Sequence, residues 1–460
     1  MYNLTAFLKR QFVLYIGLIT LLIHPVSSQV WSPFGSGTNG TVHATLVYGS
    51  TLVVAGSFSN AGGQNINRIA VWNGSNWQPL GIGTNDDVYA LTVYNGYLIA
   101  AGKFTSAGGL AANRIAVWNG SIWTTFGNGL DGSVYAMAVY GSELYVGGAF
   151  LNASGTTAFR IARWNGTWHA VGSGFDNDVY ALASFGSYLI AGGNFLAAGS
   201  QVKRIAQWNG TLWFPLGLGI DDGAVYALRS YSSQLAVGGT FTTIGGSTVN
   251  RIARWNGTSW SQVGSGFSNG VYSLFATGSL LYAGGTFDFA DFLPASRIAV
   301  FNGTSWSAVG GGVSGANSIV KAVSGYASNV VFAGIFTTAG ANTPANNIAS
   351  WGNPLGIKSV EGVIPENFIL GQNYPNPFNP VTKIKFGVPN TSEGIVNVKI
   401  EIFDALGSLA ATIVNDNISP GNYEVEFNAA GFASGMYFYR LSSGDPGRGF
   451  TETKKMIILK

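Results

Sequence analysis

The chain has 460 residues, with 23 Lys and Arg against 20 Asp and Glu and a formal net charge of +3. Charged residues make up only 9% of it, which is too few for the basic stripe that nucleic-acid binding requires, so we expect no nucleic-acid partner. It has no cysteine, which excludes disulfides, thiolate nucleophiles and Cys-based metal sites.

Residues 1–28 have the pattern of a secretory signal peptide. Lys9 and Arg10 precede an apolar run over residues 12–23, and small residues follow up to Ser28. The run is short for a membrane span, so we predict Sec export, cleavage after Ser28 and no transmembrane segment in the mature chain. A retained membrane anchor is the alternative.

Residues 29–356 repeat a unit of about 46 residues, and its most regular part is Arg-Ile-Ala-x-Trp-Asn-Gly-x-x-Trp. Each unit offers four short segments rich in β-branched and aromatic residues, separated by turns rich in Gly and Asn. Four antiparallel strands repeated around an axis are typical of a β-propeller. The leading Arg recurs at Arg68, Arg114, Arg160, Arg204, Arg251 and Arg297, with Asn347 in the last unit.

The count of strands predicts an all-β, seven-bladed propeller closed by its N-terminus. Seven first (inner) strands and seven second strands ending in Gly-x-Phe occur. A fourth, outer strand that begins with Trp follows the third strand in only six of the units. The seventh Trp strand lies at the front, at Trp31. We therefore expect the N-terminal strand to complete the last blade beside residues 348–351, which would leave no open sheet edge.

The tryptophans of the repeat, such as Trp72 and Trp77, are interpreted as structural blade residues that pack between blades. An aromatic ladder that binds sugar is the alternative.

The aspartates of the propeller are predicted to lie on one rim, together with the Arg series. One interpretation is structural: the pairs Arg68–Asp87, Arg160–Asp178 and Arg204–Asp222 would bridge neighbouring blades. The other is a polar rim that binds a carbohydrate or a cation. Asp86, Asp87, Asp221 and Asp222 are then ligand candidates, and Ca²⁺ the candidate ion, although no Asp-x-Asp-x-Asp-Gly loop is present. Otherwise we expect no cofactor.

The least repetitive loop spans residues 288–294. Departures from a repeat often mark a binding face, so Asp288, Phe289 and Asp291 are candidates for contact with a partner. The alternative is an insertion that covers the edge of a blade.

A catalytic role is not favoured. The mature chain has two histidines, His43 and His169, and His43 stands where five other units have Tyr. No nucleophile or zinc-type spacing is recognisable. Two rim aspartates acting on a polysaccharide remain an alternative, but nothing selects the two.

The strand order of the repeat resembles that of kelch-type propellers. Its residue pattern resembles the repeats of the fungal cortical polarity-marker family and of many secreted bacterial proteins. The resemblance covers about residues 30–356. It implies the architecture but no particular activity, because one fold serves many functions.

After residue 356 glycine becomes rarer, and Glu and Lys appear. Residues 357–370 are interpreted as a linker. In residues 371–460, a segment rich in Asn and Pro is followed by six alternating strands: 382–386, 396–403, 410–414, 421–427, 435–441 and 451–459. This pattern predicts a small immunoglobulin-like β-sandwich.

Several motifs of this sandwich, in order, resemble the C-terminal sorting domain (type A) of type IX secretion cargo. They are Asn-Tyr-Pro-Asn-Pro-Phe-Asn-Pro at 373–380, Ile-Phe-Asp-Ala-Leu-Gly at 402–407, Gly-Asn-Tyr at 421–423, the strand at 435–441 and Lys-Lys-Met-Ile-Ile-Leu-Lys at 454–460. The resemblance implies passage across the outer membrane, followed by secretion or attachment to the cell surface. It also implies contact between the secretion machinery and Gly435, Tyr437, Lys454, Lys455 and Lys460.

Together these features predict a secreted or surface-displayed propeller that acts as a binding or adhesion module, with a glycan or a surface protein as its partner. The alternatives are an enzyme acting on extracellular polysaccharide through the rim aspartates, and a structural surface protein.

Overall fold

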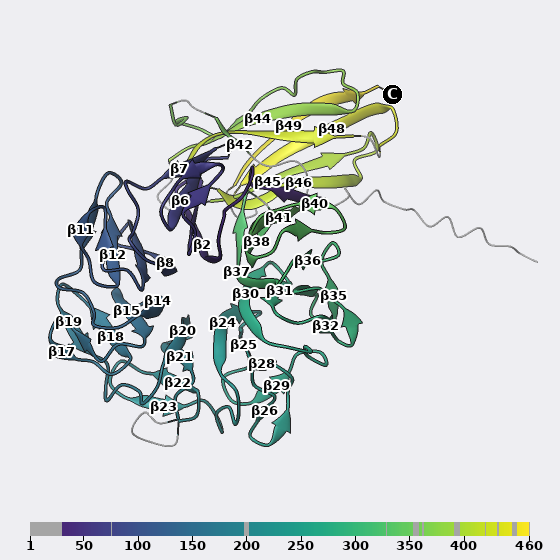
Figure 1. The fold of residues 1–460 in the computed structure, drawn as a ribbon. Coiled ribbons are helices and arrows are strands. Elements are labelled where there is room, and N and C mark those ends of the chain that lie inside the picture. The colour runs from purple at the N-terminus through teal and green to yellow at the C-terminus, as the bar shows by residue number, and fades with distance from the viewer. Residues whose placement is uncertain are drawn as a thin grey trace, which may run out of the picture.

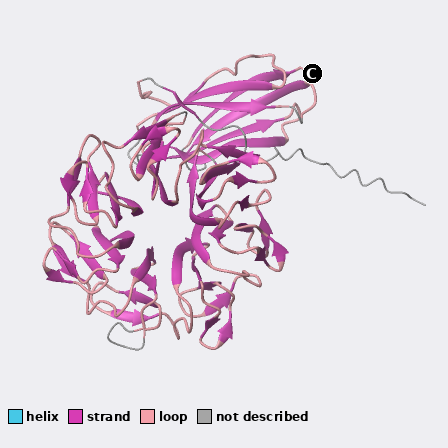
Figure 2. Cartoon of the chain, in the orientation of Figure 1, coloured by secondary structure: helices cyan, strands magenta, loops and turns pink. Residues whose placement is uncertain are grey.

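The computed structural model describes residues 30–74, 76–196, 202–327, 329–352, 358–360, 363–390, 396–418, 420–429, 432–443 and 449–459. Every helix or strand assigned in these ranges is a β-strand, as Figure 2 shows. The predicted signal peptide lies outside the described residues. No helix in the described ranges has the length and apolar character needed to cross a bilayer.

Seven four-stranded antiparallel sheets, here called blades 1 to 7, occupy residues 30–352 of the described chain. Blade 1 consists of β2 (Val42–Tyr48), β3 (Thr51–Gly56), β6 (Ile69–Trp72) and β7 (Trp77–Pro79). Blade 2 consists of β8 (Val88–Tyr94), β9 (Tyr97–Gly102), β12 (Ile115–Trp118) and β13 (Trp123–Thr125). Blade 3 consists of β14 (Val134–Tyr140), β15 (Glu143–Gly148), β18 (Ile161–Trp164) and β19 (Trp168–Ala170).

The next blades repeat this order. Blade 4 consists of β20 (Val179–Phe185), β21 (Tyr188–Gly193), β22 (Ile205–Trp208) and β23 (Trp213–Pro215). Blade 5 consists of β24 (Val225–Tyr231), β25 (Gln234–Gly239), β28 (Ile252–Trp255) and β29 (Trp260–Gln262). Blade 6 consists of β30 (Val271–Thr277), β31 (Leu280–Gly285), β34 (Ile298–Phe301) and β35 (Trp306–Ala308).

Blade 7 is built from both ends of the repeat region. It consists of β37 (Ile319–Tyr326), β38 (Asn329–Ile335), β41 (Ile348–Gly352) and, as its outer strand, β1 (Val30–Pro33). Trp31 pairs with Trp351 in the antiparallel ladder between β1 and β41. The predicted closure by the N-terminal strand is therefore present.

The loop between the second and third strands contains a small hairpin in most of the described blades. These hairpins are β4 (Asn60–Ala61) with β5 (Gln64–Asn65), β10 (Ser106–Ala107) with β11 (Leu110–Ala111), β16 (Asn152–Ala153) with β17 (Thr156–Thr157), β26 (Thr243–Ile244) with β27 (Ser247–Thr248), and β32 (Phe289–Ala290) with β33 (Leu293–Pro294). In blade 7, β36 (Val313–Ser314) joins β39 (Thr338–Ala339) and β40 (Thr343–Pro344).

The core of the propeller lies between blades. Inner strands face the centre of the ring, as Figure 1 shows, and each packs against the inner strands of both neighbouring blades, including β2 against β37. One buried apolar cluster lies at each of the seven interfaces between described blades, and one of them joins blade 7 to blade 1. The second strands are buried and end in small residues, because neighbouring sheets stack on both of their faces. A Cβ at Gly238, for example, would lie 2.7 Å from Cγ1 of Val271 in the next blade.

A tryptophan of each outer strand also ties its blade to the preceding one. Its indole N–H donates to a backbone carbonyl that follows the preceding outer strand, at 2.8–3.2 Å. The bonds run from Trp77 to Phe34, Trp123 to Leu80, Trp168 to Phe126, Trp213 to Val171, Trp260 to Leu216, Trp306 to Val263 and Trp31 to Gly310.

The C-terminal part forms two four-stranded antiparallel sheets. The first has the order β42 (Lys358–Val360), β47 (Gly421–Asn428), β44 (Val381–Val388) and β43 (Ile369–Leu370). The second has the order β46 (Leu409–Ile418), β45 (Val396–Phe403), β48 (Gly435–Ser443) and β49 (Phe450–Ile458). A single buried cluster joins residues of both sheets.

The linker interpretation of residues 357–370 missed two strands. β42 pairs with β47, and β43 pairs with β44, so this segment adds an edge to the first sheet on each side. With three and two residues, these strands are too short to show the alternation that identifies a strand in sequence.

Trp31 offers a direct test of ring closure. It is 9% exposed and packs against Phe332 and Trp351, with ring centroids 5.6 and 5.1 Å away. Trp31→Ala should lower the free energy of unfolding by about 3–5 kcal/mol, measured by urea denaturation, because it removes a buried aromatic group. Deletion of residues 30–35 should destabilise the ring further.

The control is Leu218→Ala, whose side chain is 71% exposed and should change the stability by no more than about 0.5 kcal/mol. An unchanged urea midpoint for the deletion variant would contradict closure by β1.

Candidate functional site

Most of the aspartates near the ends of the inter-blade loops serve the fold. One residue in each of six loops accepts hydrogen bonds from backbone N–H groups that follow the second strand of the next blade: two consecutive N–H groups donate in five loops, and the Leu196 N–H donates to Asp176 in the sixth. In blade 5, Asp222 accepts from the backbone N–H groups of Thr242 and Thr243, at 2.8 and 2.9 Å, and from both of their hydroxyls. The same position is held by Asn39, Asn85, Asp131, Asp176 and Ser268. Since neutral Asn and Ser also fill it, this position needs an acceptor oxygen and not a charge.

The pKa of Asp222 reflects this bonding. Burial by itself would raise the pKa of the carboxyl, but the hydrogen bonds from Thr242 and Thr243 outweigh burial and lower it below its ordinary value of 3.8. The pKa of Asp131 is lowered for the same reason, by bonds from Asn152 and Leu151.

The Arg series has an unusual backbone conformation. All six arginines have a positive φ of 60–69°, and Asn347 has 67° in blade 7. This left-handed turn lets the Arg68 N–H donate to Phe58 while the Arg68 carbonyl accepts from Gly56, and so joins the hairpin to the second strand. Asn is the residue, after Gly, that adopts this conformation most readily.

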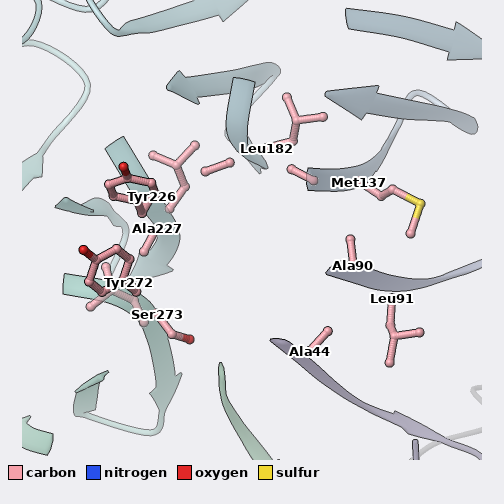
Figure 3. A pocket seen from close by; sticks show the side chains of 13 residues that line it. Ala44, Ala90, Leu91, Met137, Leu182, Tyr226, Ala227, Tyr272 and Ser273 are labelled. Carbon is pink, nitrogen blue, oxygen red and sulfur yellow. The ribbon is translucent and has the colours of Figure 1, made fainter. Parts of the chain in front are cut away.

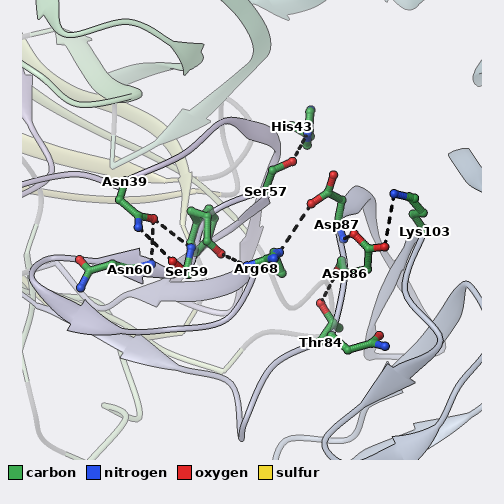
Figure 4. Close-up of polar contacts among 12 residues, drawn as sticks. Asn39, His43, Ser57, Ser59, Asn60, Arg68, Thr84, Asp86, Asp87 and Lys103 are labelled. Carbon is green, nitrogen blue, oxygen red and sulfur yellow. Dashed lines mark hydrogen bonds and ion pairs between the residues drawn. The ribbon is translucent and has the colours of Figure 1, made fainter.

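Two of the three predicted ion pairs between blades are present. Arg68 lies 3.6 Å from Asp87 (Figure 4), and Arg160 lies 3.6 Å from Asp178. The third prediction, Arg204 with Asp222, is wrong. Arg204 donates instead to the carbonyls of Ile220 and Asp221, because Asp222 is already held by the two threonines.

The other predicted ligand residues also have protein partners. Asp86 lies 3.4 Å from the Lys103 ammonium and Asp221 lies 3.5 Å from that of Lys203. In the loop 288–294, Asp288 pairs with Arg297, and Asp291 accepts from the N–H groups of Ser265 and Trp306. Phe289 is 47% exposed on its hairpin.

These carboxylates lie in several inter-blade loops around the ring, and each has a partner in its own loop or in a neighbouring blade. Among the residues that the structure describes, no group of three or more His, Cys, Asp or Glu is placed to hold a metal ion. The rim therefore supplies neither a calcium cage nor a selected pair of free acids within the described ranges.

A second set of side chains was not singled out from the sequence. In every blade the inner strand carries one extra residue, a β-bulge, near its start; in blade 2 it lies between Val88 and Ala90. We call these seven residues the inner ring: His43, Tyr89, Tyr135, Tyr180, Tyr226, Tyr272 and Lys321.

Six members of the inner ring form a continuous aromatic arc. From His43 to Tyr272, successive rings have centroids 4.9–5.6 Å apart. All seven side chains are partly exposed. His43 is the substituted inner-strand residue expected from the sequence, and Lys321 was not singled out. Both depart from an otherwise constant Tyr column, which was the available signal.

Burial and nearby charges shift the pKa values of several inner-ring residues. Burial raises the pKa of Tyr89 and Tyr180 to about 12, with further contributions from Asp87 and Asp178 respectively. Burial, then the charge of Lys321, lowers the pKa of His43 to about 4, against a smaller opposite effect of Asp87. Tyr89, Tyr180 and His43 are thus neutral at physiological pH and offer hydrogen-bonding groups beside one ammonium.

A central cavity of about 230 Å³ adjoins this ring. It is lined by small and apolar residues of six inner strands and by Tyr226 and Tyr272, which lie side by side at one edge in Figure 3. A groove of about 430 Å³ lies beside blade 5, where Trp255 and the partly exposed Trp260 meet Leu218 and several hydroxyl side chains.

The predicted sorting residues of the C-terminal part lie on paired strands. Gly435 and Tyr437 are in β48, and Lys454 and Lys455 are in its partner β49, an edge strand. The segment rich in Asn and Pro is fastened to the same two strands: Tyr439 accepts from the Asn373 N–H at 2.8 Å, and Asn376 accepts from the Ile457 N–H at 2.9 Å. Lys460 lies outside the described residues. Recognition by the secretion machinery at these residues stays a prediction.

The fold defines the class: an all-β propeller protein with an appended β-sandwich. Residues 372–459 match the family model of the secretion system C-terminal sorting domain, which makes the tail a type IX secretion signal. Residues 234–258 match a β-propeller family described as a domain of unknown function, DUF5122. No curated protein matches the chain.

The structural role of Asp222 can be tested with two variants. Asp222→Asn should be tolerated, since Asn holds the equivalent position in blades 1 and 2, whereas Asp222→Ala should lose about 1–3 kcal/mol in urea unfolding. Because the folded pKa is lowered, the carboxylate stabilises the fold above pH 3.8, and that contribution disappears as the pH falls through the folded pKa.

Acid unfolding of the Asn variant should therefore begin at a lower pH than that of the wild type. If Asp222→Ala were as stable as the wild type at neutral pH, the loop would not depend on this acceptor.

Proposed function

We propose that this exported propeller is a binding module whose ligand enters the inner-ring end of the central cavity. The inner ring carries the proposal: an arc of partly exposed aromatic side chains that adjoins a cavity. Aromatic walls with a few polar groups are typical of small-ligand sites. The sorting tail places the module at the cell surface or outside the cell, where extracellular glycans are available as ligands.

Two observations favour binding over polysaccharide cleavage. Glycoside hydrolysis needs two acids in a defined arrangement, one of them with a raised pKa. The rim acids are already engaged within the protein, because Asp222 holds a hairpin and Asp87 and Asp178 pair with arginines. The pKa of Asp178 is raised by burial, but this carboxyl is paired with Arg160.

The test is binding of the purified protein to an array of bacterial and host polysaccharides. The double variant Tyr180→Ala/Tyr226→Ala should lose at least about tenfold in affinity, because each residue supplies an aromatic contact of about 1 kcal/mol. The matched control is Tyr97→Ala/Tyr188→Ala, which removes two exposed tyrosines from the turns after the inner strands of blades 2 and 4.

The melting temperature of each variant shows whether the fold is retained. Full affinity in the inner-ring variant would show that the ligand binds elsewhere on the protein. Release of sugar products would show that the protein is an enzyme and not only a binding module.

A further inference from the structure

Lys321 is the position where the inner ring departs from an aromatic side chain. It occupies the bulge of β37 in blade 7, in register with the tyrosines of blades 2 to 6. His43 of blade 1 is its neighbour on one side, as the effect of its charge on His43 shows. Tyr272 of blade 6 precedes it in the ring, on an inner strand that packs against β37.

The ammonium of Lys321 has no counter-ion among the described residues. None of the ion pairs found in these ranges includes it. Asp87, whose charge acts on the adjacent His43, pairs with Arg68, and Asp288 of blade 6 pairs with Arg297. The side chain is only partly exposed, and burial lowers its pKa, with no neighbouring acid to oppose that effect.

An unpaired cation that is partly removed from water costs stability unless something compensates for it. The other side chains around this sector do not offset the charge of Lys321, and the charge of Asp87 is offset by Arg68. Arg297 donates to the carbonyl and hydroxyl of Ser318, three residues before Lys321. His43 is neutral and bonded to Ser57 at 2.8 Å. This sector of the ring therefore favours an anion.

The remaining members of the inner ring restrict the chemical class of the anionic ligand. The tyrosine arc offers ring faces and hydroxyl groups, which suit the mixed apolar and polar surface of a sugar. The cavity of about 230 Å³ is smaller than the roughly 300–1,000 Å³ of drug-sized pockets, so it suits a single terminal unit and not a long chain.

We propose that the inner ring binds the terminal residue of an acidic glycan, with Lys321 receiving the sugar carboxylate and the tyrosine arc receiving its ring. The proposal rests on the function proposed above and assigns its ligand class. Lys321 is then the specificity-determining residue, and a neutral sugar would leave its charge uncompensated.

The test compares galacturonate, galactose and acetate as ligands of the full-length protein by titration calorimetry. The wild type should bind galacturonate at least about tenfold more tightly than galactose, because a charge-assisted hydrogen bond is lost with the neutral sugar. Acetate, which offers the anion without the sugar ring, should bind more weakly than galacturonate.

Three variants locate the effect. Lys321→Met should abolish the preference for galacturonate, while its melting temperature without sugar should equal or exceed that of the wild type, since the unpaired charge is gone. Lys321→Arg should keep the preference. The control Lys103→Met removes an exposed lysine that pairs with Asp86 on the rim, and should also keep it.

The outcomes separate this inference from the proposed function. Equal binding of galactose and galacturonate, both lost in Tyr180→Ala/Tyr226→Ala, would overturn the acidic ligand but retain binding at the ring. Galacturonate binding that survives Lys321→Met would overturn the role of Lys321. Absence of binding by all three probes would overturn the ligand class, and absence of any ligand on the polysaccharide array would overturn the function itself.

Discussion

The bond from each outer-strand tryptophan to the preceding blade is the interaction on which the rest of the structure depends. A blade has a core only where it meets its neighbours, so the ring must close for every sheet to be covered. The indole N–H of Trp31 closes it by bonding to Gly310, across almost the whole propeller sequence. Each bond also fixes the position of one blade relative to the next, and so fixes the inner strands around the centre.

That constraint explains how polar groups are distributed. Loops between blades must place their hairpins, and most rim acids are used for this, as Asp222 is by Thr242 and Thr243. The inner ring is less restricted, because its residues sit at bulges that turn their side chains out of the stacked sheets. Positions that vary there, His43 and Lys321, change the chemistry of the centre without disturbing the interfaces.

Much of the fold was predictable because it repeats. The period, the four strands and the displaced Trp31 strand follow from the sequence, and the motifs of residues 372–459 identify the sorting domain. The candidate site was predictable only in part. A bulge adds one residue to a strand without a sequence signature of its own, so the Tyr column was read as ordinary strand. Similarly, the sequence places Arg204 near Asp222 but does not show that threonines hold the carboxylate.

The central claim is that an exported propeller of this kind recognises its ligand at the inner ring and not at the rim carboxylates. A crystal structure of the protein grown with galacturonate tests it most directly. The account predicts the sugar against the tyrosine arc, with a carboxylate oxygen about 2.7–2.9 Å from the Lys321 ammonium. A sugar bound at Asp86 and Asp221, or in the groove beside Trp260, with the inner ring unoccupied, would contradict it.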